Sequence, residues 1–276
     1  MKSAECWVSV MVFTLNESVN LPHCLRSLNW CDDIIVIDSG SEDETVDIAQ
    51  QAGARVFTHS FEGFGSQRNW ALDNTSPKHN WVLILDADER VPRALAEEVN
   101  QLVWQRPELA AARLRRRFYM WGRWLRYSSL YPVWVVRLVH CHRVRYENRG
   151  HAETQEVQGE MAALDHDLID ENHKSLDEWY RRQRRYALDD ARFEVEQETV
   201  RFSFKELFSS DPLIKTMAQK RLSWKLPFRA TIYFVYSFFL RQGFRDGLHG
   251  LRFCIMRAGY QRMVQRNKKD LKSLGR

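Results

Sequence analysis

The 276-residue sequence has only five cysteines, and no two of them stand at C-x-x-C spacing. They are Cys6, Cys24, Cys31, Cys141 and Cys254. This scattered, odd-numbered set argues against a disulfide framework or a zinc knuckle and is typical of a protein from a reducing cytosol. The first residues also lack the basic region, apolar region and cleavage site of a signal peptide, so we expect no export by that route.

Two common nucleotide-binding fingerprints are absent. The sequence has no G-x-G-x-x-G after its first apolar run and no G-x-x-x-x-G-K-[ST] anywhere. The first absence argues against a dinucleotide-dependent oxidoreductase, and the second argues against a P-loop ATPase.

The net charge of +5 is distributed unevenly along the chain. Residues 205–276 carry 16 basic and 4 acidic side chains, a net charge of +12, whereas residues 1–204 carry a net charge of −7. An acidic body with a basic tail suits an anionic membrane surface or a nucleic acid as partner.

The first hundred residues alternate between apolar runs and helical patterns. We expect strands at 7–15, 34–37, 55–57 and 81–85, and helices at 18–28, 45–52 and 67–72. Ser41 is the expected N-cap of the second helix, with Glu44 at the capping-box position. This order predicts an α/β domain with a mostly parallel sheet and ligands bound beyond the carboxyl ends of its strands.

Polar residues follow three of the expected strands. They are Asn16, Glu17, Asp38, Ser39, Asp86 and Asp88. A group so rich in carboxylates repels a diphosphate unless a divalent cation lies between them, and Mg²⁺ or Mn²⁺ prefers such oxygen ligands. The pattern therefore predicts a metal-assisted nucleotide site.

These residues resemble the family 2 glycosyltransferases of the GT-A fold. The match consists of Thr14-Leu15-Asn16-Glu17, the turn from Ile37 to Thr45, and the Asp86-x-Asp88 motif, in this order and each at a strand end. The similarity extends to the bacterial branch that adds β-glucose to lipopolysaccharide inner-core heptose. That branch is matched by the 63–69 segment, by Gly122-Arg123-Trp124, by Tyr131-Pro132 and by 241–247.

The resemblance implies an inverting, metal-dependent hexosyltransferase that uses a UDP-sugar. It also implies a donor site made by Thr14, Asn16, Glu17, Asp38, Ser39, Arg68 and Asp86, with Asp88 as the ligand of Mg²⁺ or Mn²⁺. Many family members have a second Asp where this chain has Ser39, so recognition of the base falls more heavily on Asp38 and Glu17. Arg68 is expected to reach the diphosphate.

On the acceptor side, the attacking hydroxyl must lose a proton to a base. Glu153 is the expected base, with His151 as its neighbour or substitute and Glu147 as a further candidate. Trp124, Tyr131 and Arg137 lie in a segment rich in Arg and aromatic residues, which suits an anionic glycolipid. We expect a nucleotide-sugar-binding half at 1–110, an acceptor-binding half at 111–200 and a basic helical tail at 201–276.

The tail contains an aromatic run from 226 to 240 and a basic amphipathic stretch from 248 to 263. Fifteen residues interrupted by Thr231 and Ser237 are too short and too polar to span a bilayer, so we expect a segment that lies in the membrane interface. The expected location is the cytoplasmic leaflet of the inner membrane. A helical pair packed on the catalytic domain is the alternative.

Other functions remain open on sequence alone. The same chemistry would serve transfer to a polyprenyl phosphate or to another surface polysaccharide. A non-enzymatic nucleic-acid-binding protein would explain the basic tail, but the carboxylates at the strand ends would repel a polyphosphate strand. We therefore expect no nucleic acid among the partners.

Overall fold

The computed structural model describes residues 6–149, 152–197, 203–208, 218, 221–224 and 226–274. The chain forms two compact units. The first contains Met1–Arg126 and Leu130–Ser175, and the second contains Tyr127–Ser129 and Leu176–Arg276.

The first unit is built on one mixed sheet. Its strands run in the order β3-β2-β1-β4-β8-β6-β11-β5, and β7 pairs with β6. The strands are β1 (Val8–Thr14), β2 (Ile34–Asp38), β3 (Arg55–Thr58), β4 (Trp81–Asp86), β5 (Glu89–Arg90), β6 (Ala111–Met120), β7 (Arg123–Trp124), β8 (Val133–His140) and β11 (Met161–Glu171). The first four of these in space are parallel, and β8 pairs antiparallel with both β4 and β6.

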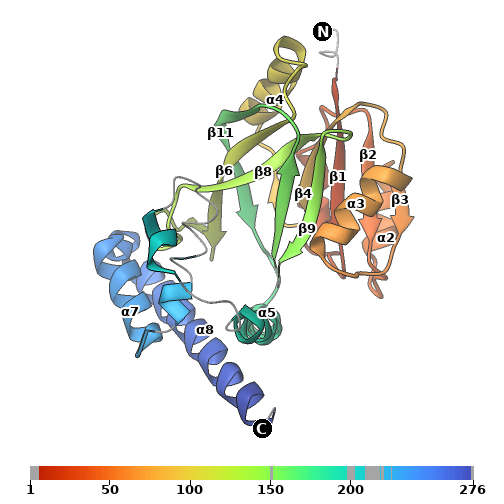
Figure 1. Ribbon diagram of the computed structural model, residues 1–276. Helices are drawn as coiled ribbons and strands as arrows, with labels where there is room; N and C mark the ends of the chain where they lie inside the picture. Colours follow the sequence, from red (N-terminus) through yellow and green to blue (C-terminus); the bar gives the residue numbers. More distant parts are fainter. Residues whose placement is uncertain are drawn as a thin grey trace. The chain divides into compact units, whose positions relative to one another are not determined.

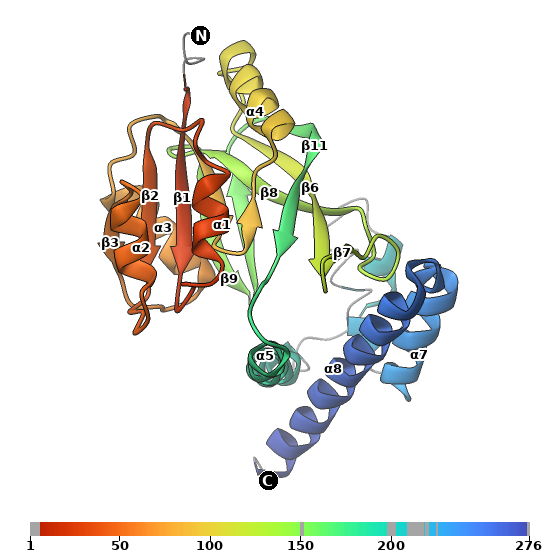
Figure 2. The ribbon, with the colours of Figure 1, turned by 180° about the vertical axis from the view of Figure 1, so that it is seen from behind.

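Helices cover both faces of this sheet. They are α1 (Leu21–Arg26), α2 (Thr45–Gln51), α3 (Phe64–Asn74) and α4 (Arg93–Gln105). Alternate residues of the central strands face opposite sides, as the pleat requires. Val10, Val12 and Leu83 pack with α1, α2 and α4, whereas Met11 and Ile84 pack with α3. Figure 1 shows α3 in front of the parallel strands, and Figure 2, from behind, shows α1 beside β1.

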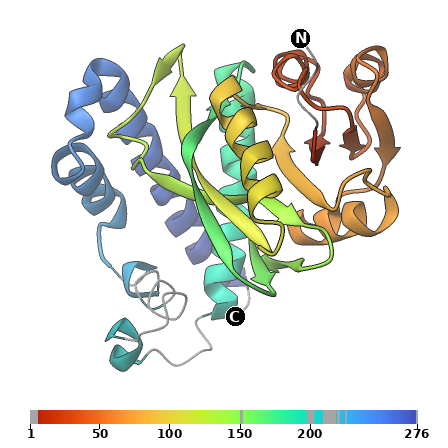
Figure 3. The same cartoon turned by 90° about the horizontal axis from the view of Figure 1, so that it is seen from above.

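The remaining part of this unit extends the sheet and adds a hairpin. Figure 3 shows α4 lying across β6 and β11, where Leu95 and Val99 join the same core as Leu114 and Leu168. The hairpin consists of β9 (Val144–Arg149) and β10 (Ala152–Val157), which pair with each other. Its Tyr146 packs in the α3 core, so the hairpin is fixed to that face.

The second unit is helical. It contains α5 (Leu176–Gln197), η1 (Phe204–Phe208), α7 (Arg229–Val235), the π-helical turn η2 (Tyr236–Leu240), η3 (Gly243–Asp246) and α8 (Gly247–Leu274). Ala187 and Ala191 of α5 pack against Tyr260 and Val264 of α8. Glu194 is buried and accepts hydrogen bonds from Arg229 at 2.5 Å and from Lys268 at 3.0 Å, so one carboxylate joins α5, α7 and α8.

Asp246 holds the short 127–129 segment. One of its carboxylate oxygens accepts hydrogen bonds from the backbone amides of Tyr127 at 2.9 Å and Ser128 at 2.8 Å, and from the Ser128 hydroxyl at 2.7 Å. A carboxylate that accepts three such bonds fixes the backbone more strongly than a neutral acceptor does.

The expected aromatic run is divided between α7 and η2, and α8 extends the expected amphipathic stretch by about eleven residues at its C-terminal end. No helix among the described residues has both the length and the apolar character needed to cross a bilayer. Exposed apolar side chains gather here instead, among them Phe228, Phe239, Leu240, Phe244 and Leu248. Arg229, the first residue of α7, pairs with Glu194 of α5.

Candidate active site

The polar residues that follow the parallel strands lie at one edge of the sheet. In the register of the strands, Thr14 is opposite Asp38 and Phe13 is opposite Asp86. Because β2 and β4 flank β1, the two aspartates are two strand spacings apart, about 10 Å. The sequence-predicted donor residues therefore share one end of the sheet.

The carboxylate of Asp38 organises the loop after β2. It accepts hydrogen bonds from the Thr14 hydroxyl at 2.9 Å, from the amides of Gly40 and Ser41 at 2.9 and 2.7 Å, and from the Ser41 hydroxyl at 2.5 Å. The Ser41 hydroxyl thus bonds to Asp38 and does not cap α2. The N-cap of α2 is Glu44, whose side chain makes no capping hydrogen bond. The expected capping box is wrong for that reason.

Asn16 and Glu17 connect the first loop to its neighbours. Asn16 has a left-handed backbone, with φ of 54°, and its side chain accepts the Glu42 amide at 2.8 Å. The Glu17 carboxylate accepts hydrogen bonds from Lys174 and Asn20, each at 2.7 Å. Burial and the nearby charge of Asp88 raise the pKa of Glu17.

Asp86 lies between two buried arginines. Arg137 donates to one carboxylate oxygen at 2.5 Å, and Arg68 donates to the other at 3.3 Å. Burial opposes ionisation of Asp86, but the charges of Arg137 and Arg68 outweigh it and lower its pKa to about 2. The Asp86 side chain remains 37% exposed, whereas each arginine side chain is 5% exposed, so the anion is the part that a ligand can reach.

Behind Asp86 lies a second layer of paired charges. Glu89 is fully buried and accepts Arg137 at 2.6 Å, and Arg116 contacts Asp170 at 3.2 Å. Burial and the neighbouring carboxylates raise the pKa of Asp170 to about 8, although Arg116 opposes the shift. Burial also raises the pKa of Glu89.

Asp88 completes the edge of the site. One of its carboxylate oxygens accepts a hydrogen bond from Asn172 at 2.8 Å, and its backbone carbonyl accepts the Glu171 amide at 3.0 Å. The network around it holds seven carboxylates and five cations, so the carboxylates outnumber the cations even when Asp170 is protonated. These are Glu17, Asp86, Asp88, Glu89, Glu153, Asp170 and Glu171 against Arg68, Arg90, Arg116, Arg137 and Lys174.

Glu153 reaches the same network from the hairpin. One terminal N–H group of the Arg68 guanidinium donates a hydrogen bond to Glu153 Oε1, and the other donates a hydrogen bond to Asp86. The second oxygen of Glu153, Oε2, is buried and has no hydrogen-bond partner among the described residues. Burial raises the pKa of Glu153, and the charges of Arg68 and Arg137 oppose the shift. Glu153 is therefore a partly desolvated carboxylate with one oxygen available for a new bond.

A glycine in the first turn of α3, Gly65, makes this arrangement possible. The Gly65 amide donates to the Asn148 side chain at 2.8 Å, and a Cβ atom at Gly65 would lie 2.9 Å from the Glu147 carbonyl carbon. Only glycine allows the hairpin to approach so closely. The approach sets Arg68, one turn into α3, beside the strand that carries Glu153.

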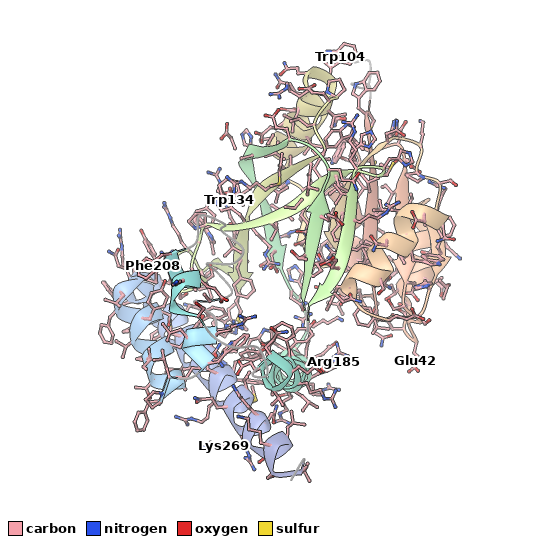
Figure 4. The ribbon with its side chains drawn as sticks, viewed as in Figure 1. Glu42, Trp104, Trp134, Arg185, Phe208 and Lys269 are labelled. Carbon is pink, nitrogen blue, oxygen red and sulfur yellow. The ribbon has the colours of Figure 1, made fainter. Side chains whose placement is uncertain are left out.

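The three expected acceptor residues, Trp124, Tyr131 and Arg137, have different environments in the structure. Trp124 and Tyr131 form an edge-to-face pair with ring centroids 5.2 Å apart, and Arg117 stacks over Trp124 at 4.8 Å. Arg137 is 4% exposed and bonded to Asp86 and Glu89, so here it is a buried counter-ion rather than an acceptor contact. Further along the sheet, Arg113 stacks at 4.8 Å over Trp134, which Figure 4 labels.

Other predicted residues have different outcomes. Ser39 accepts a hydrogen bond from Gln67 at 2.6 Å. Glu147 is exposed on β9, and His151 lies outside the described residues. Arg68, expected at the diphosphate, is 4% exposed and already engaged by two carboxylates.

Sequence reasoning missed several members of the network. Glu89, Arg116, Asp170, Asn172 and Lys174 were not recognised as site residues. The end of β11 carried a signal, because the apolar strand is followed by the polar run from 170 to 174, as at the other strand ends. Their pairing partners are distant in sequence, so that signal alone could not have assigned their roles.

Replacing Arg137 tests whether the buried charges depend on it. We expect Arg137→Met to lower the free energy of unfolding by about 3 kcal/mol, because it leaves Asp86 and Glu89 short of a buried cation, while Arg68 and Arg116 still compensate in part. Arg137→Lys should lower the free energy of unfolding by less, because it keeps a cation at this position. Urea unfolding followed by circular dichroism measures both, and a loss below about 0.5 kcal/mol in Arg137→Met would contradict the assignment.

Comparisons with known proteins agree with this architecture. Residues 9–172, more than half of the chain, match the model of the family described as glycosyl transferase family 2. Over 145 residues the chain is 31% identical to the lipopolysaccharide core biosynthesis glycosyltransferase LpsC of Rhizobium meliloti (strain 1021). That match covers 51% of this chain and 53% of LpsC, so the chain spans about half the length of this relative.

Solved structures with similar folds include TarS of S. aureus in complex with UDP-GlcNAc, at 14% identity and a TM-score of 0.44, covering 96% of this chain and 92% of that chain. Glucosyl-3-phosphoglycerate synthase from Mycobacterium tuberculosis, in complex with Mn²⁺, UDP and glucosyl-3-phosphoglycerate, is 19% identical with a TM-score of 0.45. That match covers 66% of this chain and 77% of that chain. The family match over the sheet and its polar edge shows that the chain belongs to glycosyl transferase family 2 and has the GT-A fold expected from its sequence.

Proposed function

We propose that the protein is an inverting, metal-dependent hexosyltransferase that moves a sugar, glucose in our assignment, from a UDP-sugar to a glycolipid of the lipopolysaccharide core. The observation that carries the proposal is the double contact of Arg68 with Asp86 and Glu153. The guanidinium of Arg68 forms ion pairs with a carboxylate of the donor motif and with a carboxylate of the hairpin. Inversion by a single displacement needs one such base.

The donor side fits a divalent cation. Asp88 is our proposed ligand of Mg²⁺ or Mn²⁺, and Asp86 would contact ribose or a metal-bound water. The donor set is all oxygen, and the network around it holds more carboxylates than cations, which suits a hard cation. When bound, the ion would neutralise the leaving diphosphate.

The remaining donor contacts follow from the first two loops. We propose that Glu17 and Asn16 lie against the nucleoside, with Thr14, Asp38 and Ser39 shaping the loop that receives it. Asp38 does this through its four hydrogen bonds, which fix the 39–41 backbone. Uridine is the proposed base.

On the acceptor side, Glu153 Oε2 is our proposed proton acceptor. The atom is buried and has no partner in the part of the chain that the structure describes, so a substrate hydroxyl would satisfy it. Arg68 holds the other oxygen and thereby orients the carboxylate, which makes it a positioning residue. Trp124 and Tyr131 are proposed to contact acceptor sugar rings, with the arginines beside them pairing with acidic groups.

The glycolipid assignment rests on the similarity to LpsC, a lipopolysaccharide core biosynthesis glycosyltransferase, and on this basic, aromatic surface. We propose that residues 1–110 bind the nucleotide sugar, 111–200 the acceptor and 201–276 the membrane. Transfer to a polyprenyl phosphate is the second candidate, because that acceptor also joins an anionic group to a lipid.

A donor and acceptor screen tests the proposal. Purified protein with Mn²⁺ should release UDP from a UDP-hexose, and the release should be faster when truncated lipopolysaccharide core is present. Asp88→Asn or EDTA should lower the rate at least about 100-fold, because the leaving diphosphate loses its counter-ion. Asp73→Asn removes an exposed carboxylate and should have no effect. Full activity in EDTA would refute the metal assignment, and stimulation by polyprenyl phosphate alone would favour the second candidate.

The pH dependence of kcat/KM tests the base. Glu153 must be ionised to accept a proton, so activity should fall as the pH drops through its raised pKa. Arg68 lowers that pKa, so Arg68→Gln should shift the acidic limb to higher pH, whereas the exposed Arg145→Gln should leave it in place. Glu153→Gln should lose about 100-fold or more in kcat. A limb that stays fixed in Arg68→Gln would contradict this assignment.

We also propose that the helical unit binds an anionic membrane surface at the cytoplasmic leaflet. Phe239 and Leu240 are 56% and 72% exposed, and Arg245, Arg262 and Lys269 of the same unit are exposed. Figure 4 labels Lys269 on α8. Exposed aromatic and aliphatic groups together with cations are the features of interfacial segments.

Vesicle sedimentation measures this binding. Replacing Phe239 and Leu240 together by Ser should weaken binding to phosphatidylglycerol-containing vesicles at least tenfold, because two exposed apolar groups no longer enter the interface. Trp104→Ser removes a 65% exposed ring from the other unit and serves as the control. Equal binding by all three proteins would contradict the proposal, as would salt-sensitive binding to DNA without binding to vesicles.

A further inference from the structure

The opposite end of the parallel strands gathers a different set of side chains. Cys6 precedes β1, Asp32 precedes β2 and His79 precedes β4. Their sulfur, carboxylate oxygen and imidazole nitrogen atoms all lie within 4.8 Å of one another. Since β1 is seven residues long, this cluster lies about 20 Å from the Asp38–Asp86 edge.

The three side chains are placed so that solvent can reach them. Asp32 is exposed, and Cys6 and His79 are half-buried. His79 Nε2 is 2.9 Å from one oxygen of Asp32, and Lys78 pairs with the other oxygen. Cys6 donates its thiol proton to the Val8 carbonyl at 3.2 Å, a weak bond that ionisation would remove.

We propose that Cys6, Asp32 and His79 form a second metal site, selective for Zn²⁺ and separate from the site that binds the sugar nucleotide. A thiolate, an imidazole and a carboxylate are the three ligand types that Zn²⁺ takes in proteins, whereas Mg²⁺ and Mn²⁺ avoid sulfur. In a tetrahedral zinc site the ligand atoms lie about 3.4 Å apart, so the cluster needs only small rotamer adjustments to close around the ion.

Cys31 strengthens the site without being one of its three ligands. The neighbouring Cys31 thiol lowers the pKa of Cys6 to about 6, against the effect of burial. The thiolate is the form of cysteine that binds metals. The fourth coordination position is left for water.

A metal ion bound at this site would cross-link the three segments that precede β1, β2 and β4. Cys6 lies 26 residues from Asp32, and Asp32 lies 47 residues from His79. Asp33, next to Asp32, already connects the same segments by accepting hydrogen bonds from Ser9 at 2.5 Å and from the Lys78 amide at 2.8 Å. An ion that binds only when the three segments converge stabilises the folded chain in proportion to its affinity.

Metal binding by the full chain tests the proposal. Chelator-treated, reduced protein in saturating Mg²⁺ should take up one Zn²⁺ per chain in competition with a chromophoric chelator, and Co²⁺ should give a sulfur-to-metal charge-transfer band. Cys6→Ser and His79→Gln should weaken Zn²⁺ binding at least tenfold, and Cys6→Ser should remove the band. Circular dichroism verifies that both variants are folded.

Two controls separate this site from other thiols and from the active site. Cys141→Ala removes a thiol outside the cluster, and Asp88→Asn removes the proposed active-site ligand. Both should retain the Zn²⁺ affinity and the Co²⁺ band of the unmodified chain. The proposal is overturned if the unmodified chain takes up no Zn²⁺ under these conditions, or if Cys6→Ser and His79→Gln bind it equally well.

Discussion

The site depends on the burial of two arginines among carboxylates. A buried guanidinium without a counter-ion is prohibitively costly, and so is a buried carboxylate without a cation. Arg68 and Arg137 each contact two carboxylates and meet at Asp86, and their charges keep Asp86 ionised. This mutual dependence fixes Asp86, Glu89 and Glu153 relative to one another before any substrate binds.

The fold supplies these charges from strands that are far apart in the sequence. Parallel strands β1, β2 and β4 end at one edge and bring Asp38 and Asp86 there. The antiparallel strand β8 then returns Arg137 to the same place, and the close approach of Gly65 in α3 to the hairpin brings Arg68 beside it. Preorganised charges of this kind are the usual basis of transition-state stabilisation in enzymes.

Local patterns in the sequence were sufficient to predict the strands in the parallel half of the sheet. The expected strands at 34–37, 55–57 and 81–85 agree with β2, β3 and β4 to within a residue, because continuous apolar runs bounded by turn residues carry their own signal. The helix expected at 18–28 is shorter, at Leu21–Arg26, since the loop before it is held by Asp43 and Thr45 through the amides of Ser18 and Glu17.

Pairings between distant residues could not be predicted in the same way. The residue type of Arg137 suggested an anionic acceptor, but whether an arginine faces a substrate or a buried carboxylate depends on what lies opposite it in the sheet. The cluster of Cys6, Asp32 and His79 was missed for a related reason. Sequence spacing reveals metal sites whose ligands are neighbours in the chain, and these three meet only where separate strands begin.

The central claim is that Arg68 couples the donor carboxylate to the proposed base. A double-mutant cycle in kcat/KM, with Arg68→Gln and Glu153→Gln made singly and together, measures that coupling directly. If Arg68 acts by positioning Glu153, the double variant should be about as slow as Glu153→Gln alone. Independent, multiplicative losses would contradict the account.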